Sequence, residues 1–155
     1  MRSRKIPLVL LIAGLFFLGF FREFVFENIN SHLIHLKNQD GISNLPGPLF
    51  IFKGWSFSAL YYTKFLLVLL FAAGFFGLTH WAVSIYFRTS AYWKATAALF
   101  LGVFLLSLSA FVLGKLTGFP EKGYSTARFL IEFIQSPLAL FLLIPGLTLL
   151  KEEKN

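Results

Sequence analysis

Long apolar runs separated by short polar connections dominate this sequence and predict membrane-spanning helices. An apolar run of about 20 residues can cross a hydrocarbon core about 30 Å thick as a helix. The chain has four stretches of this kind, which predict spans at about 6–26, 58–87, 95–116 and 127–150. The pattern therefore predicts an all-α integral membrane protein, with four transmembrane helices in a single bundle that forms one domain over residues 1–155.

The first span should extend beyond its uncharged core. The uncharged run 6–21 covers roughly 24 Å as a helix at about 1.5 Å per residue, which is shorter than the hydrocarbon core. We therefore expect this helix to continue past Arg22 and Glu23, with an apolar face that persists to Leu36. No Ala-x-Ala-like cleavage site follows the run, so we expect an uncleaved span. The connection 37–56 carries Pro and Gly turn signals and is expected outside the membrane.

Composition agrees with a membrane environment and narrows the partners. Hydrophobic residues make up 57% of the chain and charged residues only 14%, with a net charge of +7. The basic residues lie at the ends of the apolar runs, where they favour anionic headgroups. No basic run with interleaved aromatic residues occurs outside the spans, so the expected partners are the lipid bilayer and a larger membrane protein, with no nucleic acid.

Charge density also predicts the orientation. Basic residues are equally numerous on the two predicted sides, but those on the side of the N-terminus are packed into short segments next to the spans. The positive-inside rule then predicts that both termini are cytoplasmic.

Three basic residues and one acid are predicted to form an intramembrane polar cluster. Glu132 lies one helical turn after Arg128, and Arg22 and Lys64 are expected at the same face of the membrane. Charged groups in a span need partners, so we expect Arg22, Lys64, Arg128 and Glu132 to meet in one layer near the outer interface. The carboxylate of Glu132 could be a structural ion-pair partner or a functional acid that contacts a partner or substrate.

Prolines and small residues shape the predicted packing. Pro137 and Pro145 each remove an intrahelical hydrogen bond and should kink the fourth helix or end it early. The nearby Gln135 and Ser136 can supply donors for the freed carbonyls. The two prolines can be interpreted in two ways: as a kink that helps the helices pack, or as a broken helix that lines a transport site. Three small-residue pairs predict close helix approach: Ala73 with Gly77, Ala98 with Gly102, and Ala110 with Gly114.

The sequence predicts no catalytic, cofactor-binding or metal-ligating residue. Absence of Cys excludes disulfides and thiol nucleophiles, and Asp40 is the only Asp, so an aspartyl dyad is excluded. His32 and His35 could share a helix face with Glu27 or Asp40 as metal ligands, but that spacing is a weak signal. We interpret these two histidines as surface residues and expect His80 to hydrogen-bond another helix, with a haem-ligand role as the weaker alternative.

The last span resembles the C-terminal signature of small exosortase-associated membrane proteins. The resemblance rests on Ala-Arg-Phe-Leu-Ile at 127–131 and Gln-Ser-Pro-Leu-Ala-Leu-Phe-Leu-Leu-Ile-Pro at 135–145. It is similar too in having Arg22, with acidic and aromatic neighbours, just after the first span. The resemblance implies an accessory of an exosortase-type protein-sorting system in the bacterial inner (plasma) membrane. Exosortases use a Cys, which this chain lacks, and the family supplies no catalytic residues to carry over. Glu132 and the loop 38–53 depart from the family pattern.

These observations together predict a non-catalytic membrane accessory or scaffold protein that packs against a larger membrane partner. A small transporter or channel subunit, with Glu132 and the proline-kinked helix in its pathway, is the alternative. A redox or metal-binding membrane subunit that uses His80 with His32 or His35 is a weaker one.

Overall fold

The computed structural model describes residues 2–39 and 45–152, with side chains from Ile6 onward. The described chain is helical and contains no strand. Its elements are α1 (Arg2–Asn38), the 3-10 helix η1 (Gly47–Phe52), α2 (Phe57–Phe87), α3 (Trp93–Leu116), α4 (Pro120–Ile134) and α5 (Leu138–Glu152). α1 runs without a break past Arg22 and Glu23, as its apolar face predicts.

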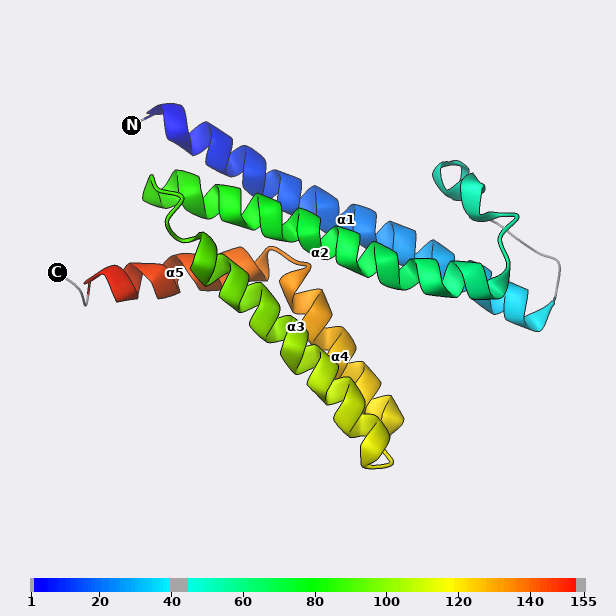
Figure 1. Cartoon of the computed structure of the whole chain (residues 1–155). Helices are drawn as coiled ribbons and strands as arrows, with labels where there is room; N and C mark the ends of the chain where they lie inside the picture. Colours follow the sequence, from blue (N-terminus) through cyan, green and yellow to red (C-terminus); the bar gives the residue numbers. More distant parts are fainter. Residues whose placement is uncertain (1, 40–44, 153–155) are drawn as a thin grey trace.

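The helices form two antiparallel hairpins that diverge from a common end (Figure 1). α1 pairs with α2 over most of its length, and α3 pairs with α4. α5 turns away from α4 and packs beside the end of the molecule that also holds the start of α1 and the α2–α3 turn. The N-terminus and the C-terminal end of α5 therefore lie at the same end of the protein (Figure 1).

Three helices are each long and apolar enough to cross a membrane, namely α1 from Ile6 onward, α2 and α3. α4 and α5 meet this criterion only as a pair, bent by 67° at the short break between them. The predicted all-α membrane bundle is thus confirmed, with three continuous spans, or four when the bent pair is counted as one. The predicted fourth span at about 127–150 corresponds to two helices, α4 and α5, with the expected interruption at Pro137. Its predicted start is too late, because α4 already begins at Pro120.

Helix ends follow local chemistry. The Ser56 hydroxyl accepts a hydrogen bond from the Ala59 amide at 3.3 Å, which satisfies one of the free donors at the start of α2. Arg88 ends α2 in the left-handed conformation with φ of 60°, and its amide donates to the Ser84 carbonyl. Gly118, with φ of 78°, occupies the same region in the α3–α4 turn, where glycine has no steric penalty.

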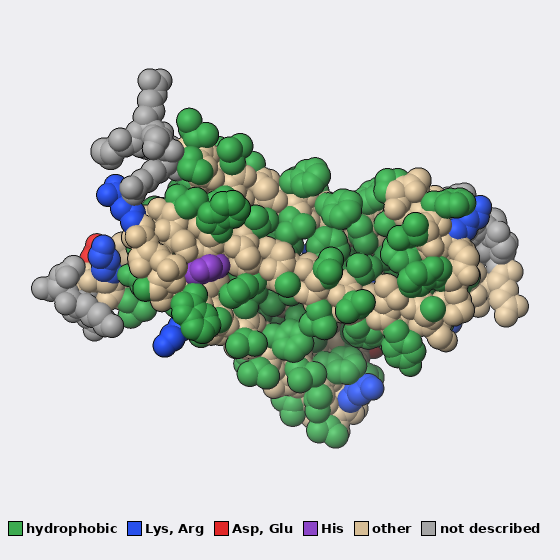
Figure 2. All heavy atoms as spheres, turned by 45° about the horizontal axis from the view of Figure 1, so that its top comes forward, with side chains coloured by type: hydrophobic (Ala, Val, Ile, Leu, Met, Phe, Trp, Pro, Cys, Tyr) green, Lys and Arg blue, Asp and Glu red, His purple; other side chains and the backbone are tan. Residues whose placement is uncertain are grey.

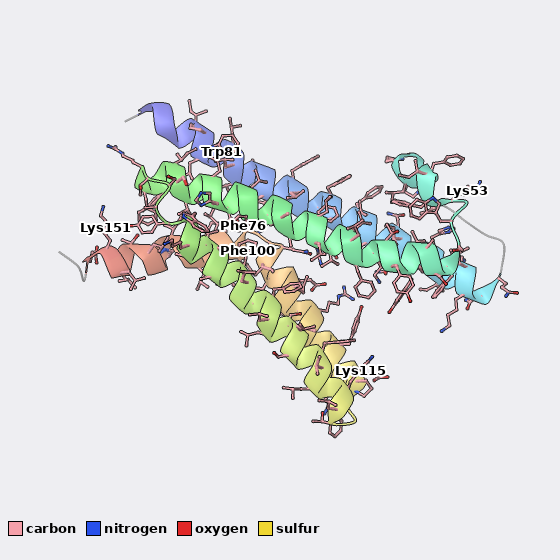
Figure 3. The ribbon with its side chains drawn as sticks, in the orientation of Figure 1. Lys53, Phe76, Trp81, Phe100, Lys115 and Lys151 are labelled. Atoms are coloured by element: carbon pink, nitrogen blue, oxygen red, sulfur yellow. The ribbon has the colours of Figure 1, made fainter. Side chains whose placement is uncertain are left out.

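The core divides into two clusters. We call the one toward the α2–α3 turn the inner cluster and the one toward η1 the outer cluster, and we use inner and outer for these two ends of the molecule. The inner cluster draws on all five α-helices and is centred on Leu15, Phe75 and Leu140, each fully buried. Phe76 and Phe100 join α2 to α3 edge to face, with ring centroids 5.4 Å apart (Figure 3). The outer cluster contains only residues of α1, α2 and η1. Hence the chain is a bundle at its inner end and two separate hairpins at its outer end.

Apolar side chains cover the middle of the molecular surface, and Lys and Arg side chains lie toward its ends (Figure 2). Lys115 and Lys151, for example, mark the tip of α3 and the end of α5 (Figure 3). Exposed leucines such as Leu101 and Leu105 lie on α3, with 62% and 59% of their surface accessible. This surface suits a bilayer, because lipid tails are as apolar as leucine. For the same reason the hydrophobic effect does not hold membrane helices together, and close packing between them does.

The hairpin of α3 and α4 depends on a contact between two glycines. A Cβ atom added to Gly114 would lie 2.5 Å from the Cα of Gly123, and one added to Gly123 would lie 2.6 Å from the Cα of Gly114. The small-residue pair ending at Gly114 therefore marks close backbone approach, as predicted. The same prediction is wrong for Gly77 and Gly102, because a Cβ added there would meet no atom of the described chain within 4 Å.

Candidate functional site

The candidate site lies at the break between α4 and α5, where a proline and two polar residues interrupt the apolar sequence. Gln135 ends α4 with non-helical φ and ψ of −94° and 38°, and Pro137 follows. The Ser136 hydroxyl donates to the Phe133 carbonyl at 2.7 Å and accepts from the Leu138 amide at 3.3 Å. Ser136 thus satisfies a carbonyl that Pro137 leaves without an amide donor, as the sequence predicts.

Gln135 connects the break to the first hairpin instead of satisfying a local carbonyl. Its side chain is buried, with 2% of the residue exposed. Its Oε1 accepts from Nε of Arg22 at 2.6 Å, and its Nε2 donates to the carbonyl of Val68 at 2.7 Å. One amide therefore links α1, α2 and the end of α4. Each polar group it satisfies would be costly to leave unpaired in a membrane.

Glu132 lies between two arginines. Nε of Arg128 donates to its carboxylate at 2.7 Å, and a terminal nitrogen of Arg22 lies 3.9 Å from the same oxygen. Arg22 also lies 3.5 Å from Glu23 and packs its guanidinium over the Phe26 ring at 5.3 Å. The side chain of Arg22 is only 12% exposed, against 59% for Arg128. We call Arg22, Arg128, Glu132 and Gln135 the polar junction.

Lys64 does not join this ion-pair cluster. Its ammonium donates to Oδ1 of Asn30 at 2.7 Å, which connects α2 to α1 within the same hairpin. Of the four residues predicted to meet, the structure brings Arg22, Arg128 and Glu132 into contact and gives Lys64 a different partner. The half-buried Asn30 amide on the neighbouring helix thus takes the place of Glu132 as the partner of Lys64.

A pocket of about 380 Å³ opens beside the junction. Phe16, Gly19 and Phe20 of α1 form its apolar part, and the polar part includes Arg22, Glu132 and Gln135. Such a lining can hold a group that is partly apolar and partly hydrogen-bonding. Ser136 also lines the pocket, and its hydroxyl donates to the backbone carbonyl of Phe133.

The junction continues outward as a row of polar side chains on α4. Glu121, Ser125, Arg128 and Glu132 follow a spacing of four, three and four residues, which places them on one face of the helix. The opposite face packs on α3, where Gly123 meets Gly114 and the Ser107 hydroxyl donates to the Ala127 carbonyl at 2.8 Å. We call the row at 121, 125, 128 and 132 the polar stripe of α4.

Within the part of the chain that the structure describes, the ion pair between the polar stripe and the first hairpin lies at the inner end of the stripe. Glu132 reaches Arg22, whereas Glu121, Ser125 and Arg128 are exposed where α4 diverges from α1 and α2 (Figure 1). The polar stripe is therefore a hydrogen-bonding surface on α4, which is long and apolar enough to cross a membrane only together with α5.

His80 lies far from the two histidines of α1. Lys64, which bonds Asn30 near His32, lies roughly 24 Å from His80 along α2 at about 1.5 Å per residue. His32 is only 4% exposed, so the interpretation of His32 as a surface residue is wrong. His80 stacks on Phe76 with centroids 6.2 Å apart, and its Nδ1 has no hydrogen-bond partner in the described chain. The expected hydrogen bond from His80 to another helix is therefore not seen at that nitrogen.

The described residues contain no group of three His, Cys, Asp or Glu side chains arranged to hold a metal ion. Asp40, considered as a ligand beside His32 and His35, lies outside the described residues. Pro145 lies inside α5, which continues to Glu152, so this proline does not end the helix.

Sequence reasoning missed the reach of Gln135 to other helices and the role of Asn30. In both cases the available signal was an amide next to an apolar run, since amides in spans usually bond across helices. Comparisons with protein-family models, curated proteins and solved structures find no match to this chain. The relation to exosortase-associated proteins therefore stays a prediction from the sequence.

Proposed function

We propose that this protein is a non-catalytic membrane accessory that binds a larger membrane protein through the polar stripe of α4. The observation that carries the proposal is the exposure of Glu121, Ser125 and Arg128 on the face of α4 opposite α3. Polar side chains that face lipid cost free energy, and although a charged residue costs most near the bilayer centre, part of that cost remains toward the end of a span. A partner helix with hydrogen-bonding side chains removes that cost.

The divergence of the two hairpins gives such a helix a place to bind. α4 packs on α3 along one side and meets α1 and α2 only near its inner end (Figure 1). A helix that enters from the outer side would contact the polar stripe and end at the polar junction, whose Arg22 has terminal nitrogens with long contacts of 3.5 and 3.9 Å. These donors have capacity for a further acceptor.

We propose an exosortase-type sorting enzyme of the bacterial inner membrane as the partner. The stretches that resemble exosortase-associated proteins, 127–131 and 135–145, include Arg128 of the polar stripe and the break between α4 and α5, whereas Glu132 departs from the family pattern. Both proposals thus concern the same part of the chain. Both termini are proposed to be cytoplasmic, which agrees with their location at one end of the molecule (Figure 1).

The test is co-purification in a mild detergent from cells that express the tagged chain and an exosortase-type enzyme. The enzyme should co-purify with the wild type and be lost from Ser125→Phe, which places a ring in the stripe. Ser109→Phe is the matched control, because Ser109 is also an exposed serine and lies on α3, outside the stripe. Equal recovery with both variants would overturn the proposal, and so would absence of the enzyme from the wild-type sample.

A small transporter or channel subunit is the second candidate, favoured by the broken helix beside a partly polar pocket. Broken spans commonly line transport sites in membrane proteins. A channel subunit should purify as a homo-oligomer with a polar pore. Light scattering on the purified protein separates the two candidates, since an accessory forms a complex with an unrelated chain.

A further inference from the structure

A second pocket lies on the opposite face of α1 from the polar junction. It has a volume of about 460 Å³ and is lined by three elements: α1 between Leu18 and Val25, α2 between Leu67 and Gly74, and Leu49 with Phe52 of η1. The two pockets use different residues of α1. These two sets of residues lie on opposite faces of the helix, about half a helical turn apart. The two pockets are therefore independent, and we call the second one the apolar groove.

The apolar groove cannot hold water. Every residue that lines it is apolar, and a buried water needs two to four polar partners. A chain of matching shape in the groove would gain dispersion contacts with its walls. An occupant made of hydrocarbon satisfies both conditions.

The position of the groove fits one lipid leaflet. On α2 it begins at Leu67, one turn after Lys64, and ends at Gly74. This length is about 10 Å at about 1.5 Å per residue, within one half of a hydrocarbon core about 30 Å thick. Leu70, on its rim, is 65% exposed, so the groove opens sideways toward lipid.

η1 lines one side of the groove, and a lysine follows η1 directly in sequence. Leu49 and Phe52 are buried against the first hairpin, whereas Phe50 and Ile51 are 62% and 69% exposed. Lys53 directly follows η1, with its ammonium 5.4 Å from the centre of the Phe50 ring (Figure 3). Basic residues at the level of the headgroups favour phosphate. Apolar walls below and a lysine above match the two ends of a phospholipid.

We infer that the apolar groove is a binding site for one acyl chain of a phospholipid, which lies along the first hairpin beside η1. The bound chain stays with the protein on extraction, unlike lipid that only contacts the outer surface of α3. The site is separate from the proposed partner-binding stripe, so either can fail without the other.

Native mass spectrometry tests this inference on protein extracted in mild detergent from vesicles of phosphatidylglycerol and phosphatidylethanolamine. The wild type should retain one phospholipid, and Gly74→Leu should lose it, because the new side chain enters the groove next to Leu18. Gly77→Leu is the control one turn further along α2, where a Cβ meets no described atom within 4 Å, and it should retain the lipid.

Equal retention by Gly74→Leu and the wild type would overturn the inference, as would a wild type without bound lipid. A wild-type dimer that Gly74→Leu dissociates would show instead that a second copy fills the groove. If Gly74→Leu does not fold, Leu67→Phe reduces the groove from the neighbouring turn and is measured in the same way, with the same two outcomes.

Discussion

The bond between Arg22 and Gln135 should contribute measurably to the stability of the folded protein. Gln135→Met removes both hydrogen bonds of the amide while it keeps a side chain of similar length. The variant leaves Nε of Arg22 without its acceptor at 2.6 Å and separates the break from the first hairpin. Arg22→Met removes the other partner, and the double variant completes a thermodynamic cycle.

The expected size follows from the burial of the pair. Hydrogen bonds to charged groups contribute about 1.5–3 kcal/mol in water-soluble proteins. Polar contacts between membrane helices average about 0.6 kcal/mol and reach about 1.7 kcal/mol, because the unfolded chain also finds partners. The Arg22–Gln135 bond is short and buried, so we expect a coupling energy of about 1 kcal/mol and a loss of about 2 kcal/mol for Gln135→Met.

Reversible unfolding in mixed micelles, followed by circular dichroism, measures the four free energies of the cycle. A polar residue outside the junction, Ser109, provides the control, because Ser109→Met should change stability by no more than about 0.5 kcal/mol. If the double variant loses the sum of the two single losses to within about 0.3 kcal/mol, the reasoning is refuted, because such additivity is typical of residues that do not interact.

Three further predictions concern packing, the helix break and topology. Gly123→Ala should destabilise the protein by about 1–3 kcal/mol in thermal unfolding, because the new Cβ would overlap the backbone at Gly114. The control Gly102→Ala should not destabilise it, and equal effects of the two variants would contradict the glycine contact. Ser136→Ala should cost about 1 kcal/mol through two lost hydrogen bonds, against no resolvable change for Ser109→Ala in the same assay. A fluorescent protein fused after Asn155 should fluoresce and an exported phosphatase at the same place should be inactive, and the reverse pattern would refute a cytoplasmic C-terminus.

Hydropathy was sufficient to predict the continuous helices, because a bilayer imposes a minimum apolar length on each span. The extension of α1 to Asn38 also followed from its residues, since the apolar face continues past Arg22. The start of α4 at Pro120 could not be predicted from hydropathy, because Glu121 and Ser125 make the first turns of this helix too polar to be identified as part of a span.

The site was only partly predictable, because it depends on how helices are rotated against one another. Pro137 predicts an interruption, but the 67° bend is fixed by the partners of Gln135 on α1 and α2, which lie far away in sequence. Arg22 and Glu132 were predicted to meet from their common membrane level. The pairing of Lys64 with Asn30 was missed, since level alone does not decide which neighbour is nearest.

Site-specific photocrosslinking on α4 tests most directly whether the polar stripe binds a partner. A photoreactive amino acid at Ser125 in cells that contain the exosortase-type enzyme should give an adduct with that larger, unrelated membrane protein. The same amino acid at Leu105, which is 59% exposed on α3, should give none. An adduct at Ser125 only with a second copy of this chain, or no protein adduct at all, would contradict the account.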